Sequence, residues 1–245
     1  MAILFDKENR VFSLQTTNTT YQMKADEHGV LLHLYYGDRV EYNMDYLVLH
    51  QPRCFAGVPY ELGQDRSYSM GVLPREYPTV GTGDFRNNAL IVRNTDGSEC
   101  CDLRYVEHHI EKGKYQLEGL PAVYATQQEA ETLSILLEDP ITKLQVKLLY
   151  GVLEEEDIIT RSALIINGGQ EQVVVEKAAS ANLDLLAGDY DLIRFWGRAT
   201  MERQFERTAI CHSRQMIDSN RGHSSHQYNP AVVLAEKNAT EDSGS

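Results

Sequence analysis

Short runs of β-branched and aromatic residues, separated by turn residues, recur along the whole chain. The clearest section runs from Glu131 to Ala178 and holds ETLSILLED, TKLQVKLLYGVL, DIITRSALIIN and QVVVEKAAS in that order. This rhythm predicts four strands in meander order. Between Lys143 and Leu149, Lys and Gln alternate with Leu and Val, which indicates one solvent-exposed and one buried face of a strand. Helical periodicity is nearly absent, so the chain is predicted to be all-β, a large antiparallel β-sandwich (a supersandwich) with long loops.

Turn residues predict where the strands join. Asp26-Glu27-His28-Gly29 lies between two apolar runs and predicts a hairpin loop. Asn94-Thr95-Asp96-Gly97 predicts a second hairpin, which joins Ala89–Arg93 to Cys100–Glu107, because Asp-Gly tolerates positive φ. Near the C-terminal end, Ala231–Ala235 opens a hairpin for which no returning strand follows. We therefore predict that residues 1–245 form one incomplete domain, truncated before its last strands.

Two stretches suit a short helical turn, Gln127–Ala130 and Met201–Arg207. In the second, Glu202-Arg203 and Glu206-Arg207 repeat at a four-residue spacing. On a helix this spacing stacks like residues on one face and pairs Glu with Arg across turns. The alternative is an arginine clamp for a sugar hydroxyl or a carboxylate.

Charge and cysteine usage exclude several classes of protein. The chain has 36 acidic and 23 basic residues, a formal charge of −13, which argues against nucleic-acid and anionic-membrane partners. The start, MAILFDKENR, carries charges where a signal peptide is apolar, and the four cysteines match no zinc-site spacing. Reduced thiols in a cytoplasmic protein are therefore expected. His223 and His226 have no third ligand at a convincing spacing, so we expect neither a metal nor a cofactor.

Two long regions, Gln51–Asn88 and Asp189–Pro230, break the strand rhythm and concentrate the candidate chemistry. A glycosidase needs two carboxyl groups across the scissile bond. Candidates are Asp65, Glu76 and Asp84 in the first region and Glu202 and Glu206 in the second. Asp65 and Asp84 each lie beside an arginine, which would hold the carboxylate ionised, so ion pairing within the loops is the competing interpretation. Five residues are interpreted as structural members of these loops: Glu76, Asp84, Arg86, His226 and Asn229.

Trp196 is the only tryptophan and lies beside Gly197 and Arg198. An aromatic face next to an arginine suits stacking against the C–H groups of a sugar ring. A core or interface position is the alternative for a lone tryptophan. The candidates for sugar contact at the rim of a substrate pocket are Trp196, Arg198, Asp65 and Arg66.

Three long runs match a known family. DRSYSMGVLPREYPTVGTGDFR (Asp65–Arg86), YDLIRFWGRATMERQFER (Tyr190–Arg207) and RGHSSHQYNP (Arg221–Pro230) resemble the amino-terminal part of bacterial α-galactosidases of glycoside hydrolase family 36. Weaker runs between them, such as LEGLPAVY and ITRSALIIN, keep the family's order and spacing. The resemblance therefore covers essentially the whole chain.

The resemblance implies a large β-sandwich followed by a (β/α)8 barrel and a smaller carboxy-terminal β domain, neither of which lies within this chain. It implies hydrolysis of terminal α-galactosyl groups in melibiose and raffinose with retention, by two aspartates on the barrel, in a homo-oligomer that is a tetramer in relatives. No aspartate of this chain is then catalytic. The loop LPREYPTVGTGDFRN (Leu73–Asn87) becomes scaffold that orders the sandwich against the barrel or a neighbouring subunit.

Two positions depart from the family's pattern. An acidic rim residue and a rim tryptophan of the family fall on Pro52 and Ala199 here, which suggests a different pocket edge unless Trp196 replaces the missing ring. Two other interpretations remain open. The chain could be a stand-alone carbohydrate-binding or oligomerisation domain, or a complete enzyme that uses the carboxylates named above.

Overall fold

The computed structural model describes residues 2–50, 65–120, 122–185, 188–222 and 226–240. The chain divides into two compact units, Met1–Asp184 and Leu185–Ser245, which we call the first and the second unit. Nearly all regular structure in the described residues is β-strand, and the strands pair antiparallel. The predicted fold class is confirmed. No helix of the described residues is long and apolar enough to cross a membrane.

The first sheet of the first unit is a four-stranded meander in the order β1-β2-β3-β4. The turn Asp26–Gly29 joins β3 to β4 as predicted, with Gly29 at a φ of +77°. Glycine adopts this conformation without steric cost. A single 3-10 turn, η1, follows β4. The elements are β1 Ile3–Asp6, β2 Val11–Gln15, β3 Thr19–Ala25, β4 Leu31–Asp38 and η1 Asp45–Leu47.

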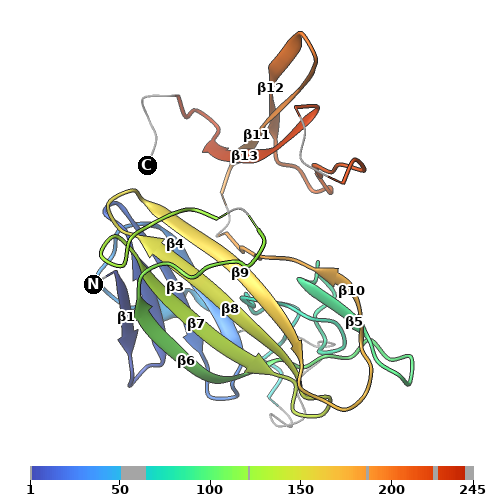
Figure 1. Ribbon diagram of the computed structural model, residues 1–245. Coiled ribbons are helices and arrows are strands. Elements are labelled where there is room, and N and C mark those ends of the chain that lie inside the picture. The colour runs from blue at the N-terminus through green and yellow to red at the C-terminus, as the bar shows by residue number, and fades with distance from the viewer. Residues whose placement is uncertain (1, 51–64, 121, 186–187, 223–225, 241–245) are drawn as a thin grey trace. The chain divides into compact units, whose positions relative to one another are not determined.

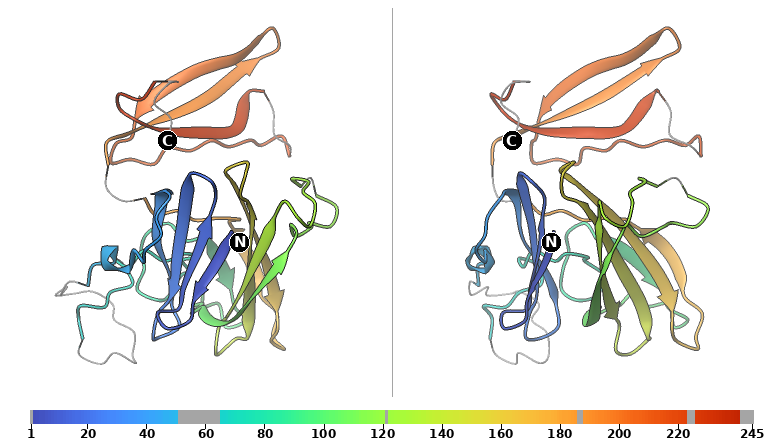
Figure 2. Two further views of the ribbon diagram at one scale, coloured as in Figure 1. Left: turned by 90° about the vertical axis from the view of Figure 1, so that its left-hand side faces the viewer. Right: turned by 60° about the vertical axis from the view of Figure 1, so that its left-hand side comes forward.

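The second sheet of the first unit has the order β6-β7-β8-β9, and Figures 1 and 2 show the two sheets as facing layers. The alternation predicted for Lys143–Leu149 is confirmed: Leu144, Val146 and Leu148 are at most 2% exposed, whereas Lys147 is only partly buried. The inward residues of both sheets form one apolar core. Each large apolar side chain buried there contributes about 1.5–3 kcal/mol. The strands are β6 Arg104–Lys112, β7 Glu131–Glu138, β8 Leu144–Leu153 and β9 Ile158–Asn167.

Strand β5 (Leu90–Arg93) pairs with β10 (Val174–Ala178), so two predicted pairings are wrong. The turn at Asn94 does close, with Gly97 N–H donating to the Asn94 carbonyl at 3.0 Å. Beyond it, however, Cys101 N–H bonds the Val80 carbonyl at 3.0 Å instead of returning along β5. The loop before β5 therefore takes the partner that the hairpin would have used. Strand β10 pairs with β5 and does not extend the meander of β7, β8 and β9.

The second unit is a three-stranded sheet in the order β12-β11-β13, formed by β11 Tyr190–Arg198, β12 Met201–Ala209 and β13 Tyr228–Glu236. The helical turn predicted for Met201–Arg207 is wrong, because these residues form most of β12. The charges meet across strands: Arg194 on β11 binds Glu206 at 3.0 Å, and Arg207 binds Asp191 at 2.7 Å. In the predicted helical turn at Gln127–Ala130, residues 127–129 form a turn without a helix.

Candidate functional site

Glu76, in the loop between η1 and β5, is the centre of a buried polar cluster between the two sheets. Its side chain is fully buried. Tyr21 on β3 donates to both carboxylate oxygens at 2.7 and 2.8 Å, and Tyr150 on β8 donates to Oε1 at 2.8 Å. Arg161 on β9 donates to the same oxygen. His33 Nδ1 on β4 lies 3.3 Å from Oε2 without hydrogen-bond geometry.

The cluster keeps Glu76 ionised. Burial would raise the pKa of the carboxyl, but the nearby Arg161 guanidinium, His33 and the Tyr21 hydroxyl outweigh it, and the net pKa lies below the usual value. Burial, with the Glu76 charge next, raises the pKa of both tyrosines well above their usual value. The tyrosines therefore remain donors. A carboxylate that is fully buried and ionised cannot serve as a general acid, and the Glu76 oxygens are taken up by hydrogen bonds within the sandwich.

The same loop binds the segment that leads out of the first unit. Arg161 donates to the Asn182 carbonyl at 2.6 Å, and Asn182 donates through its amide to the Arg75 carbonyl at 3.2 Å. Tyr77 donates its hydroxyl to the Ala179 carbonyl at 2.8 Å. These bonds fix residues 179–182 against the sandwich.

Asp84 and Arg86 form an ion pair with two hydrogen bonds, in agreement with the ion pairing interpreted from the sequence for Asp84. Arg86 Nε and Nη2 each donate to an Asp84 oxygen at 2.9 Å, and Nη2 also donates to the Leu73 carbonyl at 2.7 Å. The Asp84 side chain is fully buried. This pair closes the loop on itself and leaves no Asp84 oxygen for a substrate.

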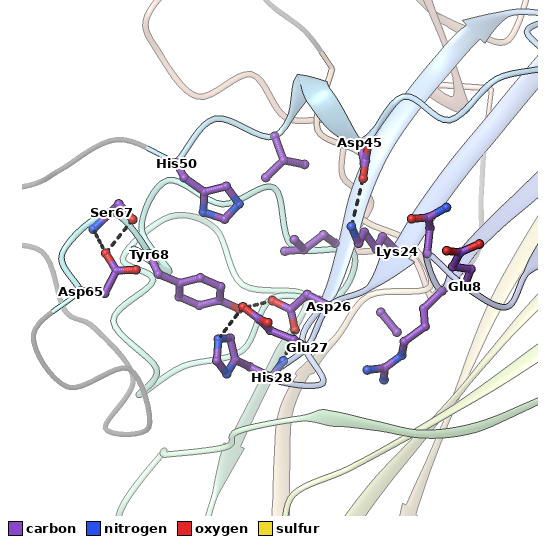
Figure 3. A pocket seen from close by; sticks show the side chains of 15 residues that line it. Glu8, Lys24, Asp26, Glu27, His28, Asp45, His50, Asp65, Ser67 and Tyr68 are labelled. Carbon is purple, nitrogen blue, oxygen red and sulfur yellow. Dashed lines mark hydrogen bonds and ion pairs between the residues drawn. The ribbon is translucent and has the colours of Figure 1, made fainter.

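A cavity of about 550 Å³ in the first unit is lined by Asp65, one of the residues predicted to contact sugar (Figure 3). The Asp65 carboxylate accepts from the Ser67 hydroxyl at 2.6 Å and from the Ser67 N–H at 2.9 Å, which lowers its pKa. Lys24 binds Asp45 at 3.0 Å on the wall of the same cavity. Arg66 is exposed. Asp65 is exposed too, and its lowered pKa keeps it ionised, so its carboxylate is a suitable acceptor for a hydroxyl group.

Asp26 ties this cavity to the β3–β4 hairpin. Its Oδ1 accepts from His28 N–H at 2.9 Å and Val30 N–H at 2.7 Å, and its Oδ2 accepts the hydroxyl of Tyr68 (Figure 3). The run that begins at Asp65 is thus anchored to the first sheet through a buried tyrosine.

Trp196 and Arg198, the other two candidates for sugar contact, line a groove of about 660 Å³ in the second unit. The two pairs of candidates therefore lie in different units. The Arg198 guanidinium contacts the Met201 sulfur, with 3.1 Å between Nη2 and Sδ. Ala199 is exposed in the turn between β11 and β12, and Pro52 lies outside the described residues.

Two residues interpreted as loop members have different outcomes. Asn229 lies in β13, so its assignment to a loop is wrong, and it is partly buried there. The following Pro230 also belongs to this strand, which is an edge strand, where proline is tolerated. His226 is exposed in the turn that precedes β13.

The carboxylates proposed from the sequence do not form a catalytic pair in the described residues. Glu76 and Asp84 are buried in ion pairs. Glu206 binds Arg194, and Glu202 accepts the Thr200 N–H at 2.8 Å, which lowers the Glu202 pKa. A retaining glycosidase needs one carboxyl with a raised pKa close to a second one. In the described residues, each of these four carboxyl groups binds an arginine or a backbone N–H, and none has a second carboxyl group as its partner.

Comparison with known proteins identifies the family of the chain. Residues 29–245 match the model of the glycosyl hydrolase family 36 N-terminal domain. The chain belongs to glycoside hydrolase family 36, as its N-terminal domain. The resemblance drawn from the three sequence runs is confirmed. No metal-binding group of three or more His, Cys, Asp or Glu occurs in the part of this family 36 domain that the structure describes.

The relatives of this family 36 domain are α-galactosidases. The bifunctional alpha-galactosidase/sucrose kinase AgaSK of Mediterraneibacter gnavus is 51% identical over 245 residues, which are 100% of this chain and 26% of that protein. Alpha-galactosidase AgaA of Geobacillus stearothermophilus is 38% identical over 250 residues, which cover 100% of this chain and 34% of that protein. This chain thus spans about a quarter to a third of the length of these relatives.

Solved structures share the fold of this family 36 domain. The galactosidase domain of AgaSK aligns with a TM-score of 0.93 at 51% identity, over 98% of this chain and 33% of that one. An AgaA variant from Geobacillus stearothermophilus, solved in complex with raffinose, aligns with a TM-score of 0.90 at 39% identity, over 94% of this chain and 32% of that one.

Proposed function

We propose that this chain is the non-catalytic amino-terminal part of an α-galactosidase that removes terminal α-galactosyl groups from melibiose and raffinose with retention. The observation that carries the proposal is the match of the whole chain to about a quarter of an α-galactosidase that is 51% identical to it. The hydrolytic aspartates then lie on a barrel outside this chain. The absence of an accessible pair of carboxyls among Asp65, Glu76 and Asp84 supports this placement.

Within the longer enzyme, the chain supplies scaffold and substrate contacts. The loop Leu73–Asn87 is the scaffold, because its buried Glu76 joins both sheets of the sandwich. Trp196 and Arg198 in the second unit, with Asp65 and Arg66 in the first, are the candidates for the rim of the galactoside pocket. The complete protein assembles as a homo-oligomer in the cytoplasm, and the free thiols of Cys100, Cys101 and Cys211 support a reducing compartment.

The downstream coding sequence tests this proposal. We expect an in-frame barrel with two aspartates at strand ends, and we expect the longer protein to hydrolyse an aryl α-galactoside and raffinose with retention, followed by NMR of the released sugar. A stop codon at the end of this chain in its native gene, or a longer protein without α-galactosidase activity, would overturn it. Such a stop codon would favour the stand-alone carbohydrate-binding domain.

A further inference from the structure

The loop between η1 and β5 presents a phenylalanine ring to solvent. Phe85 is 92% exposed, more than any other large apolar side chain in the described residues. Single exposed apolar residues are common on protein surfaces. Here, however, both neighbours are bonded inward: the Asp84 side chain is fully buried, and Arg86 binds it and the Leu73 carbonyl. The ring is therefore held outward in one position by the residues on either side of it.

The backbone that carries Phe85 is also packed against a second segment. Arg86 Nη2 lies 3.4 Å from the Met70 carbonyl oxygen, so one guanidinium bridges the loop and the turn at residues 69–73. A Cβ placed on Gly71 in that turn would lie 3.3 Å from the Gly83 carbonyl oxygen. Side chains larger than glycine would not fit there without a shift, so the two segments approach closely and support the exposed ring.

Two aliphatic side chains lie on the segments that Arg86 binds. Val72, 38% exposed, belongs to the turn whose carbonyls accept from Arg86. Leu183, 40% exposed, lines a cavity of about 280 Å³ that Arg86 also lines, and the next residue, Asp184, lies 3.5 Å from the guanidinium. An aromatic anchor with aliphatic neighbours and a polar rim is typical of residues that dominate binding energy. We call Phe85, Val72 and Leu183 the apolar patch.

The size of the apolar patch selects the kind of occupant. An aromatic ring buries roughly 150–250 Å², and two partly exposed aliphatic side chains add less. A stable complex of two free molecules buries about 800 Å² on each partner. The apolar patch alone is therefore too small to hold a second copy of the chain. A partner in the same polypeptide needs less area, because the covalent link gives it an effective concentration of about a millimolar.

The relatives contain such a tethered partner. This chain covers 26% of AgaSK and 34% of AgaA, so most of the length of these proteins lies outside it. Asp184 is the last residue of the first unit, and Arg86 binds it. The polypeptide thus leaves the first unit beside the apolar patch. Both observations favour the rest of the same polypeptide over a free partner.

We propose that Phe85 anchors the remaining part of the longer enzyme to the first unit, with its ring inserted into an apolar pocket of that part. Val72 and Leu183 complete the contact, and Arg86 and Asp184 form its polar rim. The contact serves the assembly of the enzyme and not the binding of sugar. The existence of the remaining part rests on the proposed function, whereas the presentation of the ring rests on the geometry of the first unit.

The melting of Phe85→Ala in two proteins, measured by differential scanning calorimetry, tests this anchor. In the 245-residue chain the ring is exposed, so the melting temperature should stay within about 1 °C of the wild type. In the longer enzyme the lost contact should lower the melting temperature by about 3–6 °C. Phe85→Leu keeps part of the apolar volume and should lower it by less. Tyr124→Ala, the matched control, removes an 86% exposed ring of the first unit and should change neither protein.

Three results would overturn the anchor. The first is unchanged melting of the longer enzyme, and the second is an equal shift in both proteins, which would mean that the ring is covered within the chain. The third is a lower mass of the Phe85→Ala enzyme by light scattering, which would place a second copy on the apolar patch. Calorimetry does not depend on catalysis. A shift in a longer protein that hydrolyses no α-galactoside would keep the anchor and refute the proposed function, and hydrolysis without the shift would do the reverse.

Discussion

Replacing Glu76 with glutamine is expected to lower the free energy of unfolding of the first unit by about 3–5 kcal/mol. The variant leaves the Arg161 guanidinium without its carboxylate in a place where the Arg161 side chain is only 13% exposed. A buried charge without its partner is costly because water cannot replace that partner. The hydroxyls of Tyr21 and Tyr150 also lose a charged acceptor.

Urea denaturation, followed by the near-ultraviolet circular dichroism of the tyrosines, measures this loss. Glu171→Gln makes the same chemical change at an exposed position in the turn before β10 and should alter stability by less than about 0.5 kcal/mol. Equal stability of the Glu76→Gln variant and the wild type would show that the cluster does not hold the two sheets.

The contribution of Glu76 to the stability of the first unit depends on pH with a definite sign. Folding lowers the Glu76 pKa below its usual value of 4.5. The stabilisation from the ionised Glu76 is therefore complete above about pH 4.5. It is lost as the pH falls through the lower pKa of Glu76 in the folded state. The stability gap between wild type and Glu76→Gln should narrow on acidification.

Replacing Gly81 with alanine is expected to cost about 2–5 kcal/mol. Gly81 has a φ of +87°, and a Cβ placed on it would lie 2.7 Å from both Cα and Sγ of Cys100. The positive φ costs about 1–2 kcal/mol for an L residue, and the contact with backbone adds about 1–3 kcal/mol because Cys100 must move. The neighbouring Cys101 N–H donates a hydrogen bond to the Val80 carbonyl, so a shift of Cys100 would disturb the hydrogen bond that anchors the loop.

Gly97 provides a matched control for this variant. Its φ is +85°, but no atom lies within 4 Å of the position that an alanine methyl group would occupy there. Gly97→Ala therefore incurs the backbone cost without the contact, and should destabilise the protein by only about 1–2 kcal/mol. The same loss in both variants, measured by urea denaturation, would mean that the approach to Cys100 does not matter.

The sequence predicts those parts of the fold that depend on local pattern. Alternation identifies the buried face of β8, and Asp26–Gly29 identifies the β3–β4 hairpin. Both signals lie within a few residues of the structure that they specify. The pairing of β5 with β10 could not be found in this way, because all four strands of the second sheet lie between Leu90 and Ala178 in the sequence.

The Glu76 cluster shows the same limit at the level of a site. Its partners Tyr21, Tyr150 and Arg161 lie 55, 74 and 85 residues away in the chain. Composition marked the loop as unusual, but each partner is an isolated tyrosine or arginine in an ordinary strand pattern. Only the packing of two sheets brings them together.

In the groove of the second unit, the sequence singled out Trp196 and Arg198 but not Tyr228, which also lines it. The signal for Tyr228 was the strand register, which places it opposite Trp196. The sequence pointed instead to a loop at Asn229 and to a short helical turn at Met201–Arg207, and both lie in strands. Cross-strand pairing satisfies the charges better than a single helical turn would, because Arg194 and Arg207 each bind a carboxylate on the neighbouring strand.

A hydrolytic site is not expected within this chain, and turnover of an aryl α-galactoside by the 245-residue protein is the decisive measurement. We predict no release of the aryl group above that in buffer, and no difference between the wild type and the Asp65→Ala and Asp84→Ala variants. Clear turnover that disappears in either variant would contradict this assignment, because it would place a catalytic carboxyl within this domain.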